Sequence, residues 1–322
     1  MIVSENYTVP ASKAPSSPIS EESFALLQEV RRKKPLIHCI TNYVTAGDVA
    51  NIILAAGASP IMADHPEETA EVAALCQALV LNLGTLKETS ETAMLRAGRE
   101  ASRLGHPIVL DPVGIGSSRH RTEVILSLLR EIPCSIIRGN ASEIRILSRL
   151  LNVNQARPLN RNQTLSSAPA AAFPESRGVD VSFSDCITDS TLTASAASGQ
   201  ALAARTKAVV VITGAVDIAT DGSRVLLIRN GCPEMARITG CGCMMDGILA
   251  AFAAAAISPS FSIVPLLDAA AMAAAFSGLC GELAKEKTDQ QKEGLGSFRT
   301  HFIDSVSLMT ESVLKRGVRI ES

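Results

Sequence analysis

Glycines and thiols are concentrated in the segment TGCGC (239–243), directly before an alanine-rich run. Glycines in front of a helix leave backbone N–H groups unshielded, and the helix dipole adds partial positive charge, so such a segment favours binding of a phosphate. It matches neither the Walker A loop GxxxxGK(S/T) nor the dinucleotide pattern GxGxxG, because Met245 stands in the place of the third glycine. Close packing of the alanine-rich helix on a sheet explains the glycines equally well.

Cys243 falls in the first turn of the helix that follows this segment. The positive end of the helix dipole lowers the pKa of a thiol from its usual value of about 8.5, which is the change that a general base needs. A purely structural thiol is the alternative. Asp246, one turn further on, is expected to complement the helix dipole rather than to take part in chemistry.

Two carboxylates and a guanidinium form a second candidate set. Asp111 and Glu143 end or follow consecutive predicted strands, and Arg138 lies beside them. Carboxylates hold Mg²⁺ and arginine pairs with phosphate oxygens, so the set suits phosphoryl transfer. The alternative is that Arg138 forms a salt bridge with one acid and has no other role.

The elements that position these residues follow from a regular alternation of apolar runs and amphipathic stretches, which predicts a parallel α/β sheet. Strands are expected at 36–40, 59–62, 78–83, 107–111, 134–139 and 207–214. Asp221-Gly222 predicts a tight turn in a hairpin after the last of these strands. Helices are expected at 46–56, 67–77, 88–104, 120–130, 141–151, 191–205, 242–257, 262–286 and 297–315.

Ligands of such sheets bind at the carboxyl ends of the strands. The residues that follow the apolar runs are polar at seven places, and although each place alone is more typical of a turn, their shared position along one rim indicates a site. These places are 41–42, 62–64, 82–85, 111–114, 138–140, 213–214 and 239–243.

Composition restricts the class of protein and of partner. The chain has 322 residues, 47% of them hydrophobic, and no clean boundary divides it, so we expect a single domain over 23–322. A formal net charge of −2 without charge blocks, no Trp and only 3% aromatics argue against nucleic acid or membrane as partners, and favour a small molecule. Residues 1–22 are expected to form a disordered tail, and 152–189, rich in Pro, Ser, Asn and Gln, a loop insertion.

The eight cysteines are scattered, several of them inside apolar runs, which is typical of reduced thiols in a cytosolic protein. The pair in TGCGC lacks the second ligand pair of a structural zinc site. The apolar run 248–257 is about half as long as a membrane span requires, so a buried helix is expected there.

Eight motifs of the chain resemble those of the hydroxyethylthiazole kinases, which are ribokinase-like enzymes of thiamine biosynthesis and salvage. The similarity extends from Pro35 to Arg316, with 152–189 as an insertion. Its motifs, in the family's order, are PLIHCITNYVT, GASPIMAD, LVLNLGTL, DPVGIGSS, IIRGNASEI, VITGAVD, TGCGCM and GLGSF. The resemblance implies a three-layer α/β/α fold around a central, mostly parallel sheet.

The resemblance also implies roles for individual residues, with ATP as co-substrate and Mg²⁺ as cofactor. Transfer of the γ-phosphate to the hydroxyethyl group of 4-methyl-5-(2-hydroxyethyl)thiazole is the implied reaction, and Cys243 stands where related kinases carry an aspartate base. The thiazole alcohol would contact Met62 and Gly240, with Asn42 nearby. The remaining implied contacts are those of ATP with Arg138, Thr213 and Gly242, and those of the metal with Asp111 and Glu143.

Two departures from the family pattern concern the nucleotide side. Ala215 in ITGAVD replaces a residue that is commonly acidic, and GLGSF replaces a commoner Gly-Pro-Gly-Ser-Phe. Cys241 stands where the family usually has a small residue, and no chemical role follows for it. The resemblance further implies a cytoplasmic homotrimer with its sites near the subunit interfaces.

Three other functions stay open on the sequence. A kinase of the same fold could act on another small alcohol such as hydroxymethylpyrimidine, and an ATP-dependent hydrate dehydratase has a related fold. A non-catalytic nucleotide-binding regulator is the reading that the change at Ala215 and the insertion would favour.

Overall fold

A single mixed sheet organises the computed structural model, which describes residues 18–153, 189–258 and 264–322. The strand order is β2-β1-β3-β4-β5-β6-β7-β8-β9; the neighbours from β2 to β6 pair in parallel, and β7, β8 and β9 are antiparallel additions at one edge. The strands are β1 (Leu36–Ile40), β2 (Ser59–Ile61), β3 (Ala78–Asn82), β4 (Ile108–Asp111), β5 (Ile136–Asn140), β6 (Val209–Thr213), β7 (Asp217–Thr220), β8 (Val225–Ile228) and β9 (Ile320–Glu321).

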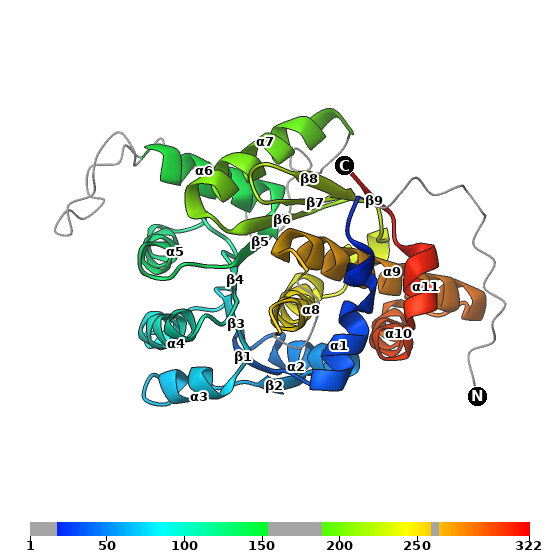
Figure 1. The fold of residues 1–322 in the computed structure, drawn as a ribbon, viewed down its shortest axis with the longest axis horizontal. Helices are drawn as coiled ribbons and strands as arrows, with labels where there is room; N and C mark the ends of the chain where they lie inside the picture. Colours follow the sequence, from blue (N-terminus) through cyan, green and yellow to red (C-terminus); the bar gives the residue numbers. More distant parts are fainter. Residues whose placement is uncertain (1–17, 154–188, 259–263) are drawn as a thin grey trace.

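Helices cover both faces of this sheet, so the predicted three-layer α/β/α architecture is confirmed (Figure 1). One face carries α3 (Thr69–Leu75), α4 (Ser90–Leu104), α5 (Arg119–Glu131), α6 (Ala141–Val153) and α7 (Asp189–Thr206). The other face carries α1 (Leu26–Lys33), α2 (Ala46–Ala56), α8 (Cys241–Ala256) and α9 (Leu266–Gln291), with α10 (Leu295–Leu308) and α11 (Glu311–Gly317) outside them. Short 3-10 helices, η1 (Glu21–Ala25) and η5 (Pro233–Arg237), complete the described elements.

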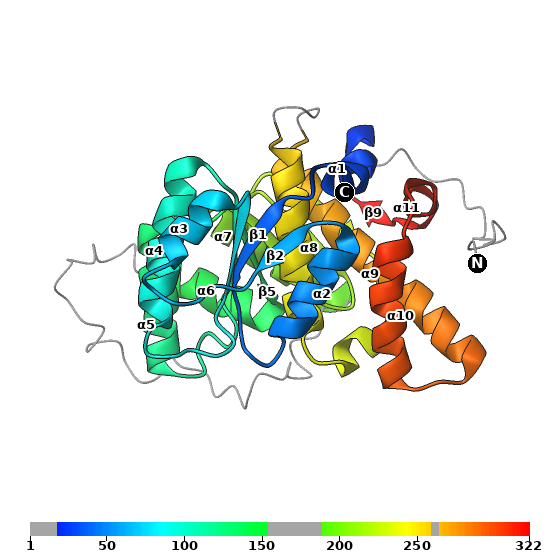
Figure 2. The same ribbon diagram turned by 90° about the horizontal axis from the view of Figure 1, so that it is seen from below.

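The strands are apolar throughout because both of their faces are buried. Along β3, Val80 packs into the core under α8 and α9, whereas Leu79 and Leu81 pack into the core under α4 and α5. Alanines are frequent in α8 and α9, and their small side chains let these two helices pack closely together. In the turned view of Figure 2, α8 and α9 lie on the side of the sheet opposite to α4 and α5.

Turns and caps form where the sequence indicates them. The hairpin of β7 and β8 turns at Gly222, which has φ +96°, and the Asp221 side chain accepts hydrogen bonds from the backbone N–H groups of Ser223 and Arg224. Gly57, in the left-handed region at φ 98°, ends α2. The predicted hairpin is therefore confirmed.

Three expectations differ from the structure. The helix expected at 67–77 is shorter, and the one expected at 297–315 is two helices, because Thr310 is extended (φ −112°, ψ 157°) and its side chain caps α11. In the tail expected over 1–22, Ile19 is buried and η1 begins at Glu21, so the end of that range packs on the fold. Most of the insertion expected at 152–189 lies outside the described residues.

The long helix α9 is apolar enough, over 26 residues, to cross a membrane by length and composition alone. However, 83% of its most apolar window is buried inside the protein. Its alanines and Phe276 lie in the core with α8, where Phe276 and Phe252 have ring centroids 5.4 Å apart. The helix is accounted for as a core helix.

Candidate active site

The centre of the candidate site is the guanidinium of Arg138, on β5, between two buried carboxylates. Its Nε donates to Oδ1 of Asp246 at 2.8 Å, and its Nη2 lies 3.0 Å from Oδ2 of Asp111 at an angle that makes an ion pair without a hydrogen bond. The Oδ1 of Asp111 is buried and also has no hydrogen-bond partner. One donor and one acceptor of this cluster therefore make no hydrogen bond within the protein.

The charges of this cluster act on one another strongly because water is excluded. Burial raises the pKa of Asp111 well above its usual range; Arg138 opposes the shift, and the neighbouring Asp246 and Glu143 reinforce it. Burial alone would lower the pKa of Arg138, but Asp111 and Asp246 outweigh it and raise that pKa. Two acids thus share one guanidinium.

Asp246 is a correction to the sequence analysis. It was expected to complement the helix dipole, but it lies beyond the first turn of α8, is fully buried and pairs with Arg138. Tertiary packing turns its side chain toward the sheet. Its spacing of three residues from Cys243, which places both on one face of the helix, was the only signal in the sequence.

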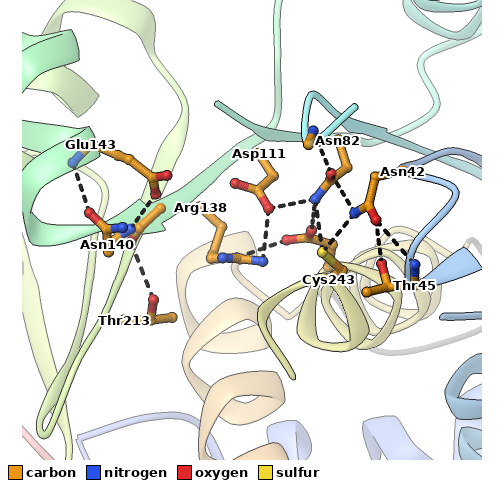
Figure 3. Close-up of polar contacts among 12 residues, drawn as sticks. Asn42, Thr45, Asn82, Asp111, Arg138, Asn140, Glu143, Thr213 and Cys243 are labelled. Carbon is orange, nitrogen blue, oxygen red and sulfur yellow. Dashed lines mark hydrogen bonds and ion pairs between the residues drawn. The ribbon is translucent and has the colours of Figure 1, made fainter. Parts of the chain in front are cut away.

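Asn82, at the end of β3, joins this charged cluster to Cys243. Its Nδ2 lies 2.6 Å from Oδ2 of Asp111, 3.0 Å from Oδ2 of Asp246 and 3.4 Å from the sulfur of Cys243 (Figure 3). The Nδ2 of Asn42, just after β1, lies 3.2 Å from the same sulfur. The sequence placed Asn82 on the polar rim but assigned it no role.

The pKa of Cys243 is the second correction. A lowered pKa was expected from the helix dipole, but burial raises it, and Asp246 and Asp111 raise it further, while Arg138 and a hydrogen bond with Thr45 oppose them. Loss of solvation and two nearby carboxylates outweigh the partial charge of the helix end. The raised pKa favours the neutral form of the Cys243 thiol.

The N-terminus of α8 lies against the Arg138 guanidinium. Gly240, the residue before the helix, has φ +80° and no side chain to cap the first backbone N–H groups. A Cβ on Gly242 would come within 2.8 Å of Nη1 of Arg138, so a side chain here would displace the guanidinium from its present position. The glycines therefore have two effects: they let the helix approach its neighbours closely, and they leave an uncapped helix N-terminus beside a cation.

Glu143 lies further along the rim and does not pair with Arg138. Its carboxylate accepts hydrogen bonds from the backbone N–H groups of Asn140 and Gly114, both at 2.8 Å, while Oδ1 of Asn140 accepts from the N–H of Glu143 at 2.9 Å. The exchange between Asn140 and Glu143 is a capping box at the start of α6. Burial nonetheless raises the pKa of Glu143, against the effect of the two N–H groups and of Arg138.

Thr213, at the end of β6, lies next to Asn140 of this capping box. It pairs in register with Asn140, and its Oγ1 donates to the carbonyl of Gly139 at 3.5 Å (Figure 3). The loop after it is held by the buried Asp217, whose Oδ1 accepts from the N–H of Gly214 at 2.8 Å. Burial raises the pKa of Asp217 to about 7.

On the opposite flank, Met62 follows the edge strand β2 and packs in part against the core under α8. The next residue, Ala63, accepts a hydrogen bond on its carbonyl from Nε2 of the buried His38, at 2.8 Å. Burial lowers the pKa of His38, which keeps the ring neutral. Cys241, whose pKa burial raises to about 12, faces no group that gives it a chemical role.

The donor set also suits a divalent cation. Asp111, Cys243 and Asp246 each offer an atom, and these three atoms lie within 4.8 Å of one another. Of the three, Asp111 has the buried oxygen without a partner. The predicted magnesium ligand Asp111 is thus placed to bind a cation, whereas the oxygens of Glu143 already accept from backbone.

Comparison with known proteins identifies one family over most of the chain. The profile of the hydroxyethylthiazole kinase family matches residues 27–172 and 169–312. A relative named hydroxyethylthiazole kinase from Clostridium acetobutylicum is 39% identical over 296 residues, which is 92% of this chain and 98% of that protein.

Solved structures agree with the sequence comparison. A hydroxyethylthiazole kinase protein from Pyrococcus horikoshii superimposes with a TM-score of 0.74 at 30% identity, over 94% of this chain and 99% of that one. A ribokinase-like superfamily protein from Enterococcus faecalis matches with a TM-score of 0.54 at 14% identity, over 95% of this chain and 91% of that one, which concerns the fold alone. The fold is ribokinase-like, and the chain belongs to the hydroxyethylthiazole kinase family.

Proposed function

We propose that this protein is an ATP-dependent kinase that phosphorylates the hydroxyethyl group of 4-methyl-5-(2-hydroxyethyl)thiazole in thiamine biosynthesis or salvage. The substrate follows from the names of its relatives, and the type of reaction from the chemistry of the site. The proposal rests on one observation. The uncapped N-terminus of α8 lies beside Arg138 and Asp111, and each of these two side chains has a buried polar atom without a hydrogen-bond partner.

That arrangement supports binding of a transferring phosphoryl group. The backbone N–H groups of residues 240–243 and the guanidinium of Arg138 are donors for phosphate oxygens, in a place from which water is largely excluded. The adenine nucleotide would then extend along the rim toward Thr213, with Gly242 against its phosphates. Held donors of this kind stabilise charge in the transition state without reorganisation.

Mg²⁺ is the proposed cofactor, held by the free oxygen of Asp111 and, through water, by Glu143. When bound, the ion neutralises charge on the phosphates. Asn82 and Arg138 fix the second oxygen of Asp111, so the first one stays directed at the ligand.

On the acceptor side, we place the thiazole alcohol between Met62, Gly240 and Asn42, with its hydroxyl at Cys243. Phosphoryl transfer proceeds through a loose transition state, which demands little proton removal before attack. The thiolate form of Cys243, which the raised pKa makes a minor form but a stronger base, accepts the proton late in the reaction, when the alcohol has become strongly acidic.

A homotrimer in the cytoplasm is the proposed state of the protein. Exposed apolar side chains after β1 and on α2 support an assembly that covers them: Tyr43 is 71% exposed, Val44 59% and Leu54 56%. The seven cysteines that the structure describes are all free thiols, as in a reducing compartment.

A direct assay tests the function. The purified protein is incubated with Mg-ATP and, in parallel, the thiazole alcohol or hydroxymethylpyrimidine, and ADP and phosphorylated product are followed. We expect product with the thiazole alcohol. Product with the pyrimidine alone would assign another kinase of this fold, and nucleotide binding without product would assign a regulator.

A further inference from the structure

The sulfur of Cys243 contacts the side-chain amide of Asn42, and two donors of Thr45 set the direction of that amide. Oδ1 of Asn42 accepts from the backbone N–H of Thr45 at 3.1 Å and from Oγ1 of Thr45 at 3.0 Å. A backbone N–H can only donate, so the oxygen of Asn42 must face Thr45. Its Nδ2 therefore faces the sulfur of Cys243 and Oδ1 of Asn82, each at 3.2 Å.

Asn82 is fixed in the same way, because its Oδ1 accepts from the backbone N–H of Gly84 at 3.0 Å. Its Nδ2 consequently points to the carboxylates and to Cys243 (Figure 3). The two hydrogens of the Asn82 amide go to the carboxylates at 2.6 and 3.0 Å, with the sulfur further away at 3.4 Å, so Asn42 is the main amide donor to the sulfur, which acts as a hydrogen-bond acceptor. If the Asn42 amide were reversed, its oxygen would accept a hydrogen bond from the S–H group, and the thiol would then be a donor.

Thr45 occupies the residue before α2, where a threonine hydroxyl usually accepts from the first turn of its own helix. Here it makes no such cap. The buried hydroxyl serves Asn42 instead, and the methyl group packs on Gly240, where a Cβ would come within 2.5 Å of it. Thr45 therefore contacts both Asn42 and the start of the phosphate-binding helix.

We propose that Thr45 is a positioning residue of this kinase: its hydroxyl, through Asn42 and by its own contact with the thiol, keeps hydrogen-bond donors directed at the sulfur of Cys243. The inference rests on the proposed function, in which Cys243 receives the proton of the alcohol. It assigns to Thr45 and Asn42 a chain of hydrogen bonds that ends on the reacting thiol.

Two substitutions separate the hydroxyl from the methyl group. Thr45→Val keeps the shape and loses the hydroxyl, and we expect kcat for the thiazole alcohol to fall about 10-fold, with KM for ATP unchanged. Thr45→Ser keeps the hydroxyl and should stay within about two-fold of the wild type. Equal losses in both variants would overturn the proposal, since they would assign the effect to packing on Gly240.

A double-mutant cycle tests whether Thr45 acts through Cys243. In a Cys243→Ala background, Thr45→Val should have almost no further effect on kcat, because the group that it positions is gone. The same fold-decrease in both backgrounds would overturn the proposal.

A substrate-free measurement keeps this test independent of the proposed function. Alkylation of Cys243 by iodoacetamide, measured by peptide mass spectrometry against Cys241 as internal control, should slow in Thr45→Val and not in Thr45→Ser. An unchanged ratio of the two cysteines in Thr45→Val would contradict the inference, whatever alcohol the enzyme phosphorylates.

Discussion

The carboxylates of this site are held in two different ways. Asp111 and Asp246 share the guanidinium of Arg138 and the amide of Asn82, so side chains from four different elements depend on one another. Glu143 and Asp217 are held by backbone N–H groups, from Asn140 and Gly114 in one case and from Gly214 in the other. The first arrangement has no local support, whereas the second is built largely into helix and loop ends.

The two ways of holding a carboxylate indicate which residues of the site depend most on tertiary structure. Where buried charges are paired only by side chains distant in the sequence, the loss of one partner destabilises the protein, because the other charge stays buried and uncompensated. Carboxylates held by backbone N–H groups lose less when they change, because the main chain stays in place. Substitutions should therefore affect turnover most in the Arg138 cluster and least at Asp217.

Arg138→Ala is the largest expected effect. It leaves two buried carboxylates without their counter-charge and removes a phosphate donor, so we expect a loss of about 3–5 kcal/mol in stability and of nearly all turnover. Urea denaturation and the ADP assay measure the two losses. Arg138→Lys is the matched control: it keeps the charge but not the planar fork, and should recover stability more than turnover. An active Arg138→Ala enzyme would contradict the comparison.

Asp111→Asn should cost about 100-fold in turnover or more, because it removes the carboxylate with the free oxygen. Asp246→Asn, its partner on the same guanidinium, should cost much less turnover, since the structure gives that carboxylate no unpartnered buried oxygen. Neither should lower stability as much as Arg138→Ala, because each relieves repulsion between two acids. Turnover as a function of Mg²⁺ concentration distinguishes them, and equal losses would show that Asp111 is not special.

Glu143→Gln should lower turnover about 10-fold and destabilise the protein by about 1–3 kcal/mol. Glutamine can maintain the capping box with Asn140, but its NH₂ group cannot accept from Gly114. Thermal unfolding and the Mg²⁺ dependence of turnover are the measurements. A loss as large as that of Asp111→Asn would mean that the backbone-held carboxylate is a direct metal ligand.

Cys243→Asp should keep turnover within about 10-fold of the wild type, because the loose transition state needs little help from the base. The substitution brings a third acid next to Asp111 and Asp246, so the remaining loss measures how far the Arg138 cluster tolerates another charge. A dead Cys243→Asp enzyme beside an active Asp111→Ala enzyme would refute the assignment of roles.

Asp217→Asn should have the smallest effect on turnover, and a pH-dependent effect on stability. Because burial raises the pKa of Asp217 from 3.8 to about 7, the folded state holds a proton that the unfolded state has lost between these values. Stability contributed by this group therefore decreases as pH rises from 4 to 7. The variant should be more stable than the wild type at pH 8 and equal to it near pH 4, as urea denaturation at both pH values would show.

Most of the elements, their order and the rim on which the polar residues meet could be predicted from the sequence, whereas α1 and β9 had no counterpart among the predicted elements. Apolar runs bounded by Gly, Asn and Asp predicted the strands from β1 to β6 to within about two residues, since burial of both faces requires continuous apolar residues. The motifs from ITN to TGCGC identified the residues of the rim, including Arg138, Asp111 and Cys243. Even the Asn140–Glu143 capping box is a local pattern that four residues specify.

How the residues of the rim pair and ionise depends on the tertiary structure. Arg138 and Asp246 are 108 positions apart, and Asn42 and Cys243 are 201 apart, so no local rule predicts their contacts. The raised pKa of Cys243 reversed the expectation from its helix position, because desolvation and neighbouring carboxylates depend on what the whole fold packs around the thiol. Secondary structure follows from short-range patterns, whereas the charge state of a buried group follows from its long-range surroundings.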